Sequence, residues 1–217
     1  MSSLLASIVP SRRRLALKSL VGALALVCIP AASAHAATGL LTTDACDNAT
    51  LTQPFLKWGD SNSYKLVPGG NFEGSMTGWA LSHGAAVKSG SEPFGATGSV
   101  GHSLYLPAGA SAQSPYTCVD YAYPTFRFFA KNNTLLSTVV VSVVYKEPLL
   151  GPVAIPIGPV ALSPSWGPSL PMLTASFAQE IVNGLLGSGT PQVALRFTAV
   201  TGSSEIDDVY VDPHEMR

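Results

Sequence analysis

The sequence predicts an all-β sandwich that forms a single domain. From Tyr64 onwards, short runs rich in β-branched and aromatic residues are separated by Gly, Pro and Ser, which is typical of two packed β-sheets. Two runs, TFRFFAK at 125–131 and VALRFTAV at 193–200, alternate so that apolar side chains share one face. The expected strands are Tyr64–Val67, Trp79–Leu81, Ala85–Lys88, Ser103–Leu106, Thr117–Asp120, Thr125–Lys131, Ser137–Tyr145, Val153–Ile157, Val193–Val200 and Glu205–Val211.

The first 36 residues have the pattern of an export signal. Four basic residues at 12–18 precede an apolar core at 20–29, and AASAHAA offers cleavage after Ala34 or Ala36. A membrane anchor is the alternative, but the core is far shorter than the roughly 20 apolar residues that span a bilayer. We therefore expect a cleaved signal peptide at 1–36 and a secreted chain. Export would use the general route or, because Ser11-Arg12-Arg13 resembles its signal, the twin-arginine route.

The charge balance argues against two classes of partner. Removing residues 1–36 takes away four of the 12 basic residues and none of the 13 acidic ones, which leaves a formal net charge of −5. Such a chain has no basic patch to attract nucleic acid or anionic lipid. We expect neither nucleic-acid binding nor membrane insertion after signal cleavage.

An irregular N-terminal arm is expected at 37–63, ahead of the sandwich domain at 64–217. The arm has no periodicity and is rich in Thr, Asn and Asp. Cys46 and Cys118 are the two cysteines left after signal cleavage, and an exported pair favours a disulfide that pins the arm. Two free thiols are the alternative. The apolar patch Pro54-Phe55-Leu56, together with Trp58, would also attach the arm to the domain.

The stretch 147–171 holds seven prolines, and proline is confined to sheet edges and bulges because it cannot donate a ladder hydrogen bond. We expect an edge strand with long loops there. The segment Ser176–Leu186 is the only helical candidate: Ser176 and Gln179 have the spacing of a capping box, although Gly184 weakens the helix.

The last expected strand carries two adjacent carboxylates, Asp207 and Asp208. Successive side chains of a strand point to opposite faces, so one of them should face solvent and the other inward. An inward carboxylate needs a cation or several hydrogen-bond donors. Glu73 lies far upstream in GGNFEGSMTGW, and we expect the first and last strands to meet near it.

The order of motifs resembles the galactose-binding-like jelly roll of many carbohydrate-binding modules. The motifs are LVPGGNFE at 66–73, Gly78-Trp79, SLYL at 103–106, the aromatic strand at 127–131, Trp166 and IDDV at 206–209. The resemblance covers about residues 64–213 and implies a jelly-roll β-sandwich. The whole mature chain also resembles secreted proteins of high-GC Gram-positive bacteria.

In such modules the glutamate of the F-E motif and an aspartate of the last strand commonly bind a structural Ca²⁺. The resemblance therefore implies Glu73 and Asp207 as ligands, with Asp208 as the weaker choice. Independently, oxygen donors from the first and last strands suit Ca²⁺, which takes 6–8 oxygen ligands. The alternative is a pair of surface carboxylates capped by backbone N–H groups.

Three residues are candidates for contacting a ligand. If Phe126 and Phe128 face the core, then Arg127 and Arg196 on the two alternating strands face outward, where their guanidinium groups suit hydroxyl-rich or carboxylate ligands. Pairing with a carboxylate of the protein is the alternative. Trp58 is the most plausible exposed aromatic residue, although packing of the arm explains it equally well.

The sequence offers no catalytic signature. It lacks G-x-S-x-G, H-E-x-x-H and a Cys–His arrangement, and two aspartates that point to opposite faces could not act together in glycoside hydrolysis. We expect a secreted, non-catalytic protein that binds polysaccharide or cell-envelope glycan. The alternative is a structural or adhesive envelope protein that makes protein contacts and has no sugar ligand.

Overall fold

The computed structural model describes residues 50–98, 101–118, 125–147, 151–174 and 192–212. The chain divides into two compact units, Met1–Thr38 and Gly39–Arg217, and every described residue belongs to the second. The expected signal peptide, Cys46 and the helix expected at 176–186 lie outside the described residues. In the described ranges, no helix has the length and hydropathy needed to cross a membrane.

Strands are the main regular structure of the described residues, and the one helix among them is a short 3₁₀ turn. The elements are β1 (Leu51–Thr52), the 3₁₀ helix η2 (Leu56–Trp58), β2 (Tyr64–Leu66), β3 (Ala80–Ser82), β4 (Ala86–Ser89), β5 (His102–Leu106), β6 (Ser111–Gln113), β7 (Thr117–Cys118), β8 (Thr125–Asn132), β9 (Thr138–Glu147), β10 (Gly151–Val160), β11 (Gly167–Pro168), β12 (Met172–Leu173), β13 (Gln192–Thr201) and β14 (Ser204–Asp212).

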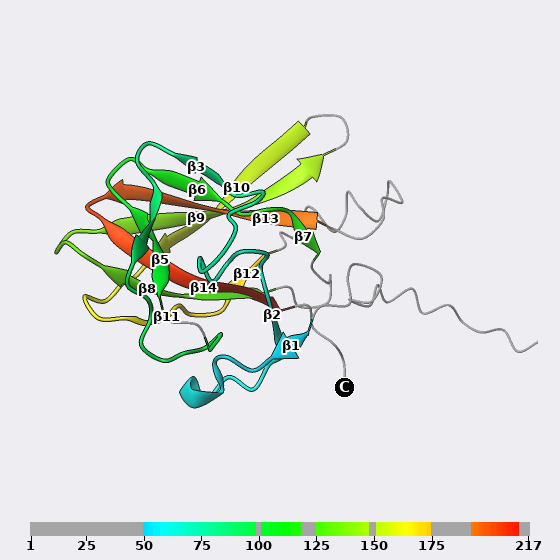
Figure 1. The fold of residues 1–217 in the computed structure, drawn as a ribbon. Coiled ribbons are helices and arrows are strands. Elements are labelled where there is room, and N and C mark those ends of the chain that lie inside the picture. The colour runs from blue at the N-terminus through cyan, green and yellow to red at the C-terminus, as the bar shows by residue number, and fades with distance from the viewer. Residues whose placement is uncertain (1–49, 99–100, 119–124, 148–150, 175–191, 213–217) are drawn as a thin grey trace, which may run out of the picture. The chain divides into compact units, whose positions relative to one another are not determined.

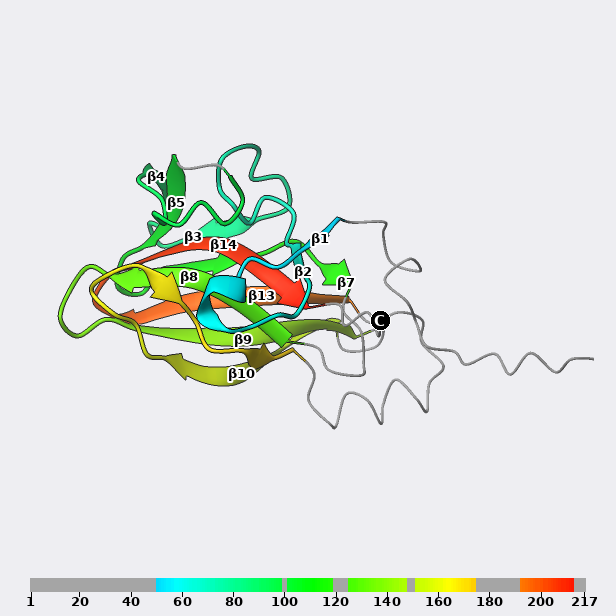
Figure 2. The same cartoon turned by 90° about the horizontal axis from the view of Figure 1, so that it is seen from below.

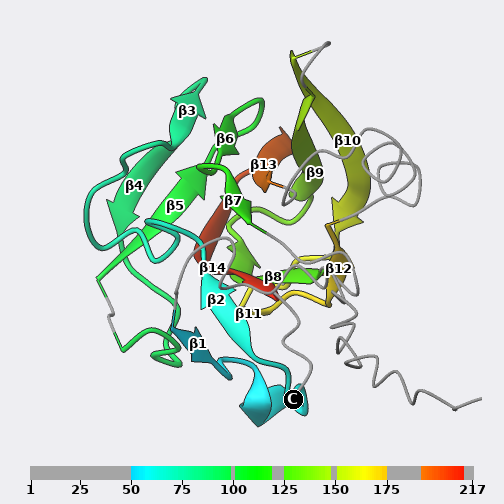
Figure 3. The same cartoon turned by 90° about the vertical axis from the view of Figure 1, so that its right-hand side faces the viewer.

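Two antiparallel sheets, here sheet A and sheet B, make up the sandwich (Figure 1). Sheet A has eight strands. Five follow the path β1-β2-β14-β5-β4, and the other three join through β8, which pairs with β14, β11 and β12. Sheet B has six strands along the path β10-β9-β13-β6-β3, with β7 paired to β13. Figure 3 shows the five strands of the sheet B path in this order. The all-β jelly-roll sandwich that the sequence predicts is confirmed.

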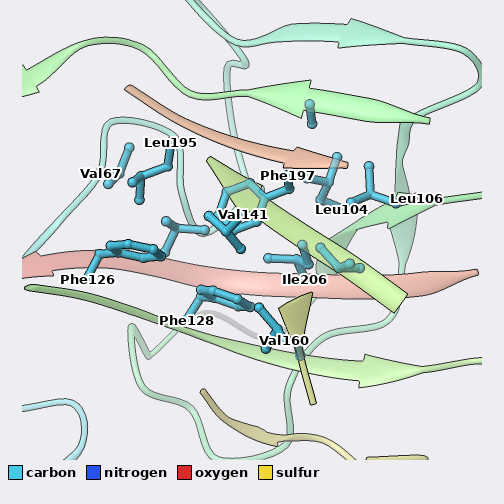
Figure 4. Packing of buried hydrophobic residues seen from close by; sticks show 14 of the residues in the cluster. Val67, Leu104, Leu106, Phe126, Phe128, Val141, Val160, Leu195, Phe197 and Ile206 are labelled. Carbon is cyan, nitrogen blue, oxygen red and sulfur yellow. The ribbon is translucent and has the colours of Figure 1, made fainter. Parts of the chain in front are cut away.

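The core lies between the sheets because the strands alternate as their sequences predict. Phe126 and Phe128 of β8 point inward and meet Leu195 and Phe197 of β13, with the rings of Phe128 and Phe197 5.0 Å apart in an edge-to-face contact. Figure 4 shows these side chains together with aliphatic residues of both sheets. Trp79 also joins the core. Each such buried side chain contributes about 1.5–3 kcal/mol relative to an exposed one.

The proline-rich strand β10 lies at an edge of sheet B, as the sequence predicts. Among the described strands it pairs only with β9, and its register shifts between Pro156 and Gly158. Prolines at an edge leave few free N–H donors for pairing with another chain.

The first and last strands of the domain meet, as predicted. Leu66 and Lys65 of β2 pair with Tyr210 and Val211 of β14. The contact continues past β2, because the N–H of Val67 donates to the carbonyl of Val209 over 2.9 Å. β14 therefore runs between β8 on one side and both β5 and β2 on the other.

A second apolar cluster covers the outer side of sheet A, away from sheet B. Phe55 of the arm is fully buried there and stacks on Phe129 of β8, with Tyr64 and Tyr210 packed edge-to-face against it. Figures 1 and 2 show η2 (cyan) on this side of sheet A. The described end of the arm is therefore attached through an aromatic side chain.

Candidate functional site

β14 contains a bulge at its two aspartates. It pairs with β8 at Asp207 and Phe129 and next at Tyr210 and Arg127, so two residues of β14 stand opposite one residue of β8. Asp208 has φ +48°. Asp adopts this left-handed conformation more readily than most residues, because its short side chain can hydrogen-bond locally.

The bulge changes the direction of the side chains that follow it. Ile206 and Val209 both join the core between the sheets, although strict alternation would separate them. Asp207 and Asp208 both lie on the outer side of sheet A, where Tyr210 packs in the second cluster. The prediction that one aspartate faces solvent and the other faces inward is therefore wrong, because the inserted residue interrupts the two-residue period.

The loop at 90–98 covers both carboxylates, and each aspartate is only 1% exposed. Asp207 Oδ2 accepts hydrogen bonds from Ser91 Oγ at 2.6 Å and from the backbone N–H of Glu92 at 3.0 Å. Asp207 Oδ1 accepts from the backbone N–H of Asp208 at 2.9 Å. Asp208 Oδ1 accepts from the hydroxyl of Thr97 at 3.1 Å.

Three carboxylates share this buried space. Glu92 is also fully buried, and it accepts hydrogen bonds from the backbone N–H groups of Phe94 and of Ala96, the latter at 2.7 Å. Burial raises the pKa of Asp207 to about 6, and burial together with the charge of Asp207 raises the pKa of Asp208 to about 8. Asp208 Oδ2 is buried without a hydrogen-bond partner. An oxygen in this position calls for a proton or a cation.

The donor set at Asp207 and Asp208 suits a hard cation. Two carboxylates and the hydroxyls of Ser91 and Thr97 supply oxygen only, which is the ligand type that Ca²⁺ prefers. Glu92 is directed to the N–H groups of its own loop. Across the described part of the chain, no group of three or more His, Cys, Asp or Glu side chains is arranged to hold a metal ion. Asp207 and Asp208 would thus be the anionic ligands, completed by neutral oxygens.

Glu73, the other expected calcium ligand, has a different set of contacts. Its Oε1 accepts from the backbone N–H groups of Gly101 and His102 at 2.6 and 2.8 Å, and its Oε2 lies 3.0 Å from His102 Nδ1. These hydrogen bonds lower the pKa of Glu73, with the His102 ring as the largest cause. Both oxygens of Glu73 are therefore engaged at the start of β5. This matches the backbone-capping alternative for that residue.

Arg127 is buried, with 5% of the residue exposed. Its Nη1 lies 2.5 Å from Asp60 Oδ2, while Nε and Nη2 donate to the carbonyl of Ser169 at 2.9 and 2.7 Å. The guanidinium also lies 4.2 Å from the ring centroid of Phe55. Arg127 thus links the arm to sheet A through a carboxylate of the protein and is not presented to a ligand.

Trp58 is half-buried and belongs to the aromatic packing of the arm. Its ring lies 4.9 Å from the ring of Phe94 and 5.3 Å from that of Phe129, both edge-to-face. Packing of the arm therefore accounts for this tryptophan.

Arg196 is half-exposed on the outer face of sheet B. Its Nε and Nη2 donate to Gln113 Oε1 on the neighbouring strand β6 at 3.1 and 2.7 Å. Arg196 also stands opposite Ser142 of β9 in the register of the sheet. The candidate ligand residues are thus not brought together: Arg196 lies on sheet B, and Arg127 and Trp58 lie on the outer side of sheet A.

The disulfide between Cys46 and Cys118 stays a prediction. Cys118 ends β7, and Cys46 lies outside the described residues.

Two important residues were missed by reasoning from the sequence. Glu92 is the only charged residue between Lys88 and His102 in the sequence. A single carboxylate in a Gly- and Ser-rich loop was the feature that could have marked it as a candidate site residue. Gln113 carried no signal, because its role depends on a strand pairing with Arg196 across 83 positions of the chain.

Comparisons with known proteins found similarity to solved structures. No model of a protein family matches the sequence, and a search of curated proteins gives no match. A xylanase chain of Clostridium thermocellum, containing a family 22 carbohydrate-binding module and a family 10 catalytic module in complex with xylohexaose, gives a TM-score of 0.46 at 14% identity. The match covers 65% of this chain and 27% of the xylanase chain.

Two isolated modules give similar matches. The family 22 xylan-binding domain of Paenibacillus barcinonensis matches with a TM-score of 0.43 at 10% identity, over 64% of this chain and 88% of the module. The family 11 module of Clostridium thermocellum, in complex with a mixed-linked β-1,3-1,4 tetrasaccharide, matches with a TM-score of 0.37 at 11% identity. This match covers 68% of this chain and 95% of the module. The resemblance to secreted proteins of high-GC Gram-positive bacteria remains a prediction. These modules are β-sandwich proteins to which this chain is similar, and the assignment of its fold rests on the two sheets described above.

Proposed function

We propose that the chain is a secreted, non-catalytic carbohydrate-binding protein and that its ligand lies on the outer face of sheet B. The observation that carries this proposal is a continuous set of small and hydrogen-bonding side chains across five adjacent strands. We call this set the sheet B face. It consists of Ala80 and Ser82 of β3, Ser111 and Gln113 of β6, Arg196 and Thr198 of β13, Val140 and Ser142 of β9, and Pro156 and Pro159 of β10.

The register of the sheet aligns these residues in two rows that cross the strands. One row has Gln113, Arg196 and Ser142 at its centre, and the other has Ser111 and Thr198, whose hydroxyl oxygens lie 3.3 Å apart. All of these side chains are at least partly exposed. Strands lie about 4.8 Å apart, so the face extends roughly 20 Å from β3 to β10.

Such a face suits a sugar chain. Hydroxyl and amide groups both donate and accept hydrogen bonds, as sugar hydroxyls require, and short side chains leave an extended ligand room to lie across the strands. The non-catalytic part of the proposal is supported by the burial of Asp207 and Asp208, which leaves neither carboxylate accessible to a substrate on sheet A.

Binding to polysaccharides with a matched pair of variants tests the proposal. The double variant Gln113→Ala/Thr198→Ala removes two hydrogen-bonding groups from the sheet B face, and Ser89→Ala removes an exposed hydroxyl from β4 of sheet A. Each lost hydrogen bond contributes about 0.5–1.5 kcal/mol, so the double variant should bind roughly tenfold more weakly. Pull-down on insoluble polysaccharides and affinity electrophoresis measure this. Failure of the unaltered protein to bind any glycan, or equal binding by all three proteins, overturns the proposal.

We also propose that Asp207 and Asp208 bind a structural Ca²⁺. The unpartnered Asp208 Oδ2 beside a second buried carboxylate supports this assignment. The ion would neutralise the cluster and so hold the loop at 90–98 against β14. Isothermal titration of the EDTA-treated protein with Ca²⁺ tests it, and the absence of binding at millimolar Ca²⁺ contradicts it.

One observation favours the alternative function in protein adhesion. Leu135 and Leu136, at the turn between β8 and β9, are 91% and 80% exposed. The turn is held by the hydroxyl of Ser137, which lies within hydrogen-bond distance of the carbonyls of Thr134 and Ser203. Exposed leucines on a held turn suit an apolar pocket of a partner protein. If Leu135→Ser/Leu136→Ser abolishes attachment to cell envelopes and the sheet B variants do not, the adhesive function is supported instead.

A further inference from the structure

We infer that the ligand of the sheet B face carries carboxylate groups, as the uronic acid residues of acidic polysaccharides do. This inference rests on the proposed function and adds the chemical class of the glycan. Three features of the described residues carry it: the distribution of acidic side chains, the open edge of one guanidinium, and the neutrality of its surroundings.

Acidic side chains gather on sheet A and its loops. Every carboxylate whose surroundings the structure describes belongs to β14 or to a loop that contacts sheet A: Asp60, Glu73, Glu92, Glu205, Asp207, Asp208 and Asp212. The ion pairs of the described arginine and lysine side chains also lie on sheet A, as those of Arg127 with Asp60 and of Lys131 with Glu205 do. None of the residues that define the sheet B face is acidic, although β9 of sheet B ends at Glu147.

Arg196 is the one cation among the residues that define the sheet B face, and in the described part of the chain only one edge of its guanidinium donates hydrogen bonds. Gln113 Oε1 accepts from Nε and Nη2, which together form that edge. The opposite edge consists of Nη1 and the second N–H of Nη2. Within the described ranges, Nη1 has no acceptor, and no carboxylate lies within ion-pair distance of Arg196.

The described neighbours of Arg196 on this face are neutral. Gln113 and Ser142 flank it across the strands, and Ala80 and Pro156 continue the row at either end. Gln113 fixes the plane of the guanidinium, so the open edge can donate two parallel hydrogen bonds. This planar pair matches the two oxygens of a carboxylate, and such charge-assisted bonds are about twice as strong as neutral ones. A neutral sugar offers no group with that geometry and charge.

Oligogalacturonides and their fully methyl-esterified forms provide a direct test, because they share one backbone and differ in the carboxylate. The unaltered protein should bind the acidic form at least tenfold more tightly than the ester. Raising the ionic strength from 0.01 to 0.15 M should weaken binding, because the Debye length falls from about 30 Å to about 8 Å. Alginate oligosaccharides extend the test to a second uronate backbone, and xylohexaose serves as a neutral glycan.

Arg196→Gln and Lys88→Gln separate a local contact from a general charge effect. Both change the net charge equally, but Lys88 is exposed on β4 of sheet A. Arg196→Gln should weaken binding of the acidic glycan about ten- to a hundredfold, which is typical of losing a hydrogen bond to a charged group, and Lys88→Gln should leave it unchanged. Thermal unfolding shows whether each variant folds.

The outcomes separate the two proposals. Equal binding of acid and ester, or binding of xylohexaose that depends on Gln113 and Thr198, overturns the inference and leaves the proposed function standing. Binding of acidic glycan that Arg196→Gln does not weaken also overturns the inference, because the carboxylate then binds elsewhere. If no glycan of either kind binds, both proposals fail.

Discussion

Replacing Asp208 by Asn should stabilise the protein in EDTA and remove its response to calcium. Asn keeps the size of the side chain and tolerates the left-handed backbone at φ +48°, so the substitution changes the charge with little backbone strain. The carbonyl of Asn can still accept from Thr97, as Asp208 Oδ1 does at 3.1 Å. The new amide can donate to a neighbouring carboxylate from the position where Asp208 Oδ2 has no partner.

The size of the expected stabilisation follows from the raised pKa of the buried Asp208 carboxyl. Its pKa is about 8 in the folded chain and 3.8 as the ordinary value. At pH 7 this difference lowers the free energy of unfolding by ~4 kcal/mol, because each pH unit from the ordinary pKa up to pH 7 contributes about 1.36 kcal/mol. Asn does not carry this penalty, so we expect the free energy of unfolding in EDTA to rise by about 2–4 kcal/mol. For a domain of this size the Tm should increase by roughly 5–15 °C.

Thermal and urea unfolding at pH 7 measure the effect, with and without Ca²⁺. The unaltered protein should gain ~4 kcal/mol when free Ca²⁺ is a thousandfold above Kd, and Asp208→Asn should gain little. Glu205→Gln is the control on the same strand: its carboxylate lies 3.0 Å from Lys131 Nζ near the surface, so its loss should leave the calcium response intact. A destabilised Asp208→Asn in EDTA would show that the charge of Asp208 does not oppose folding, and an unchanged calcium response would show that Asp208 does not bind the ion.

Three further predictions concern pH, the arm and the approach to the bulge. In EDTA, both aspartates have raised pKa values, so between pH 5 and 8 the folded chain binds more protons than the unfolded one. The free energy of unfolding should therefore fall, on the order of 5 kcal/mol, as pH rises through this window, and a rise would contradict the assignment. Arg127→Gln should destabilise the protein by about 3–5 kcal/mol in urea unfolding, because it leaves the carboxylate of Asp60 unpaired. The same variant should bind glycan normally at temperatures where it is folded, and a selective loss of binding would restore Arg127 as a ligand residue. Gly70→Ala should cost about 1–3 kcal/mol, since its Cβ would lie 2.9 Å from two backbone oxygens, whereas Gly74→Ala, with nothing within 4 Å, should be close to neutral.

Local patterns predicted the fold because strand alternation is a local property. The alternation in TFRFFAK correctly places Phe126 and Phe128 in the core, since no bulge interrupts β8 there. The same reasoning failed at Asp207 and Asp208, where β14 inserts one residue relative to β8. Nothing in the letters IDDV distinguishes a regular strand from a bulged one.

The side-chain partners could not be predicted, because they come from distant parts of the chain. Asp60, 67 positions before Arg127, determines whether that arginine is buried or faces a ligand. Ser91 reaches Asp207 across 116 positions. Pairings of this kind depend on how the loops pack on the sheets, which the periodicity of single strands does not encode.

The location of the ligand is tested most directly by two-dimensional ¹H–¹⁵N NMR of the labelled protein during titration with oligosaccharide. We predict that the largest shift changes fall on the backbone amides of Gln113, Ser142, Arg196 and Thr198, which lie on three neighbouring strands of sheet B. Changes confined to the outer side of sheet A, or to the turn that carries Leu135, would contradict it.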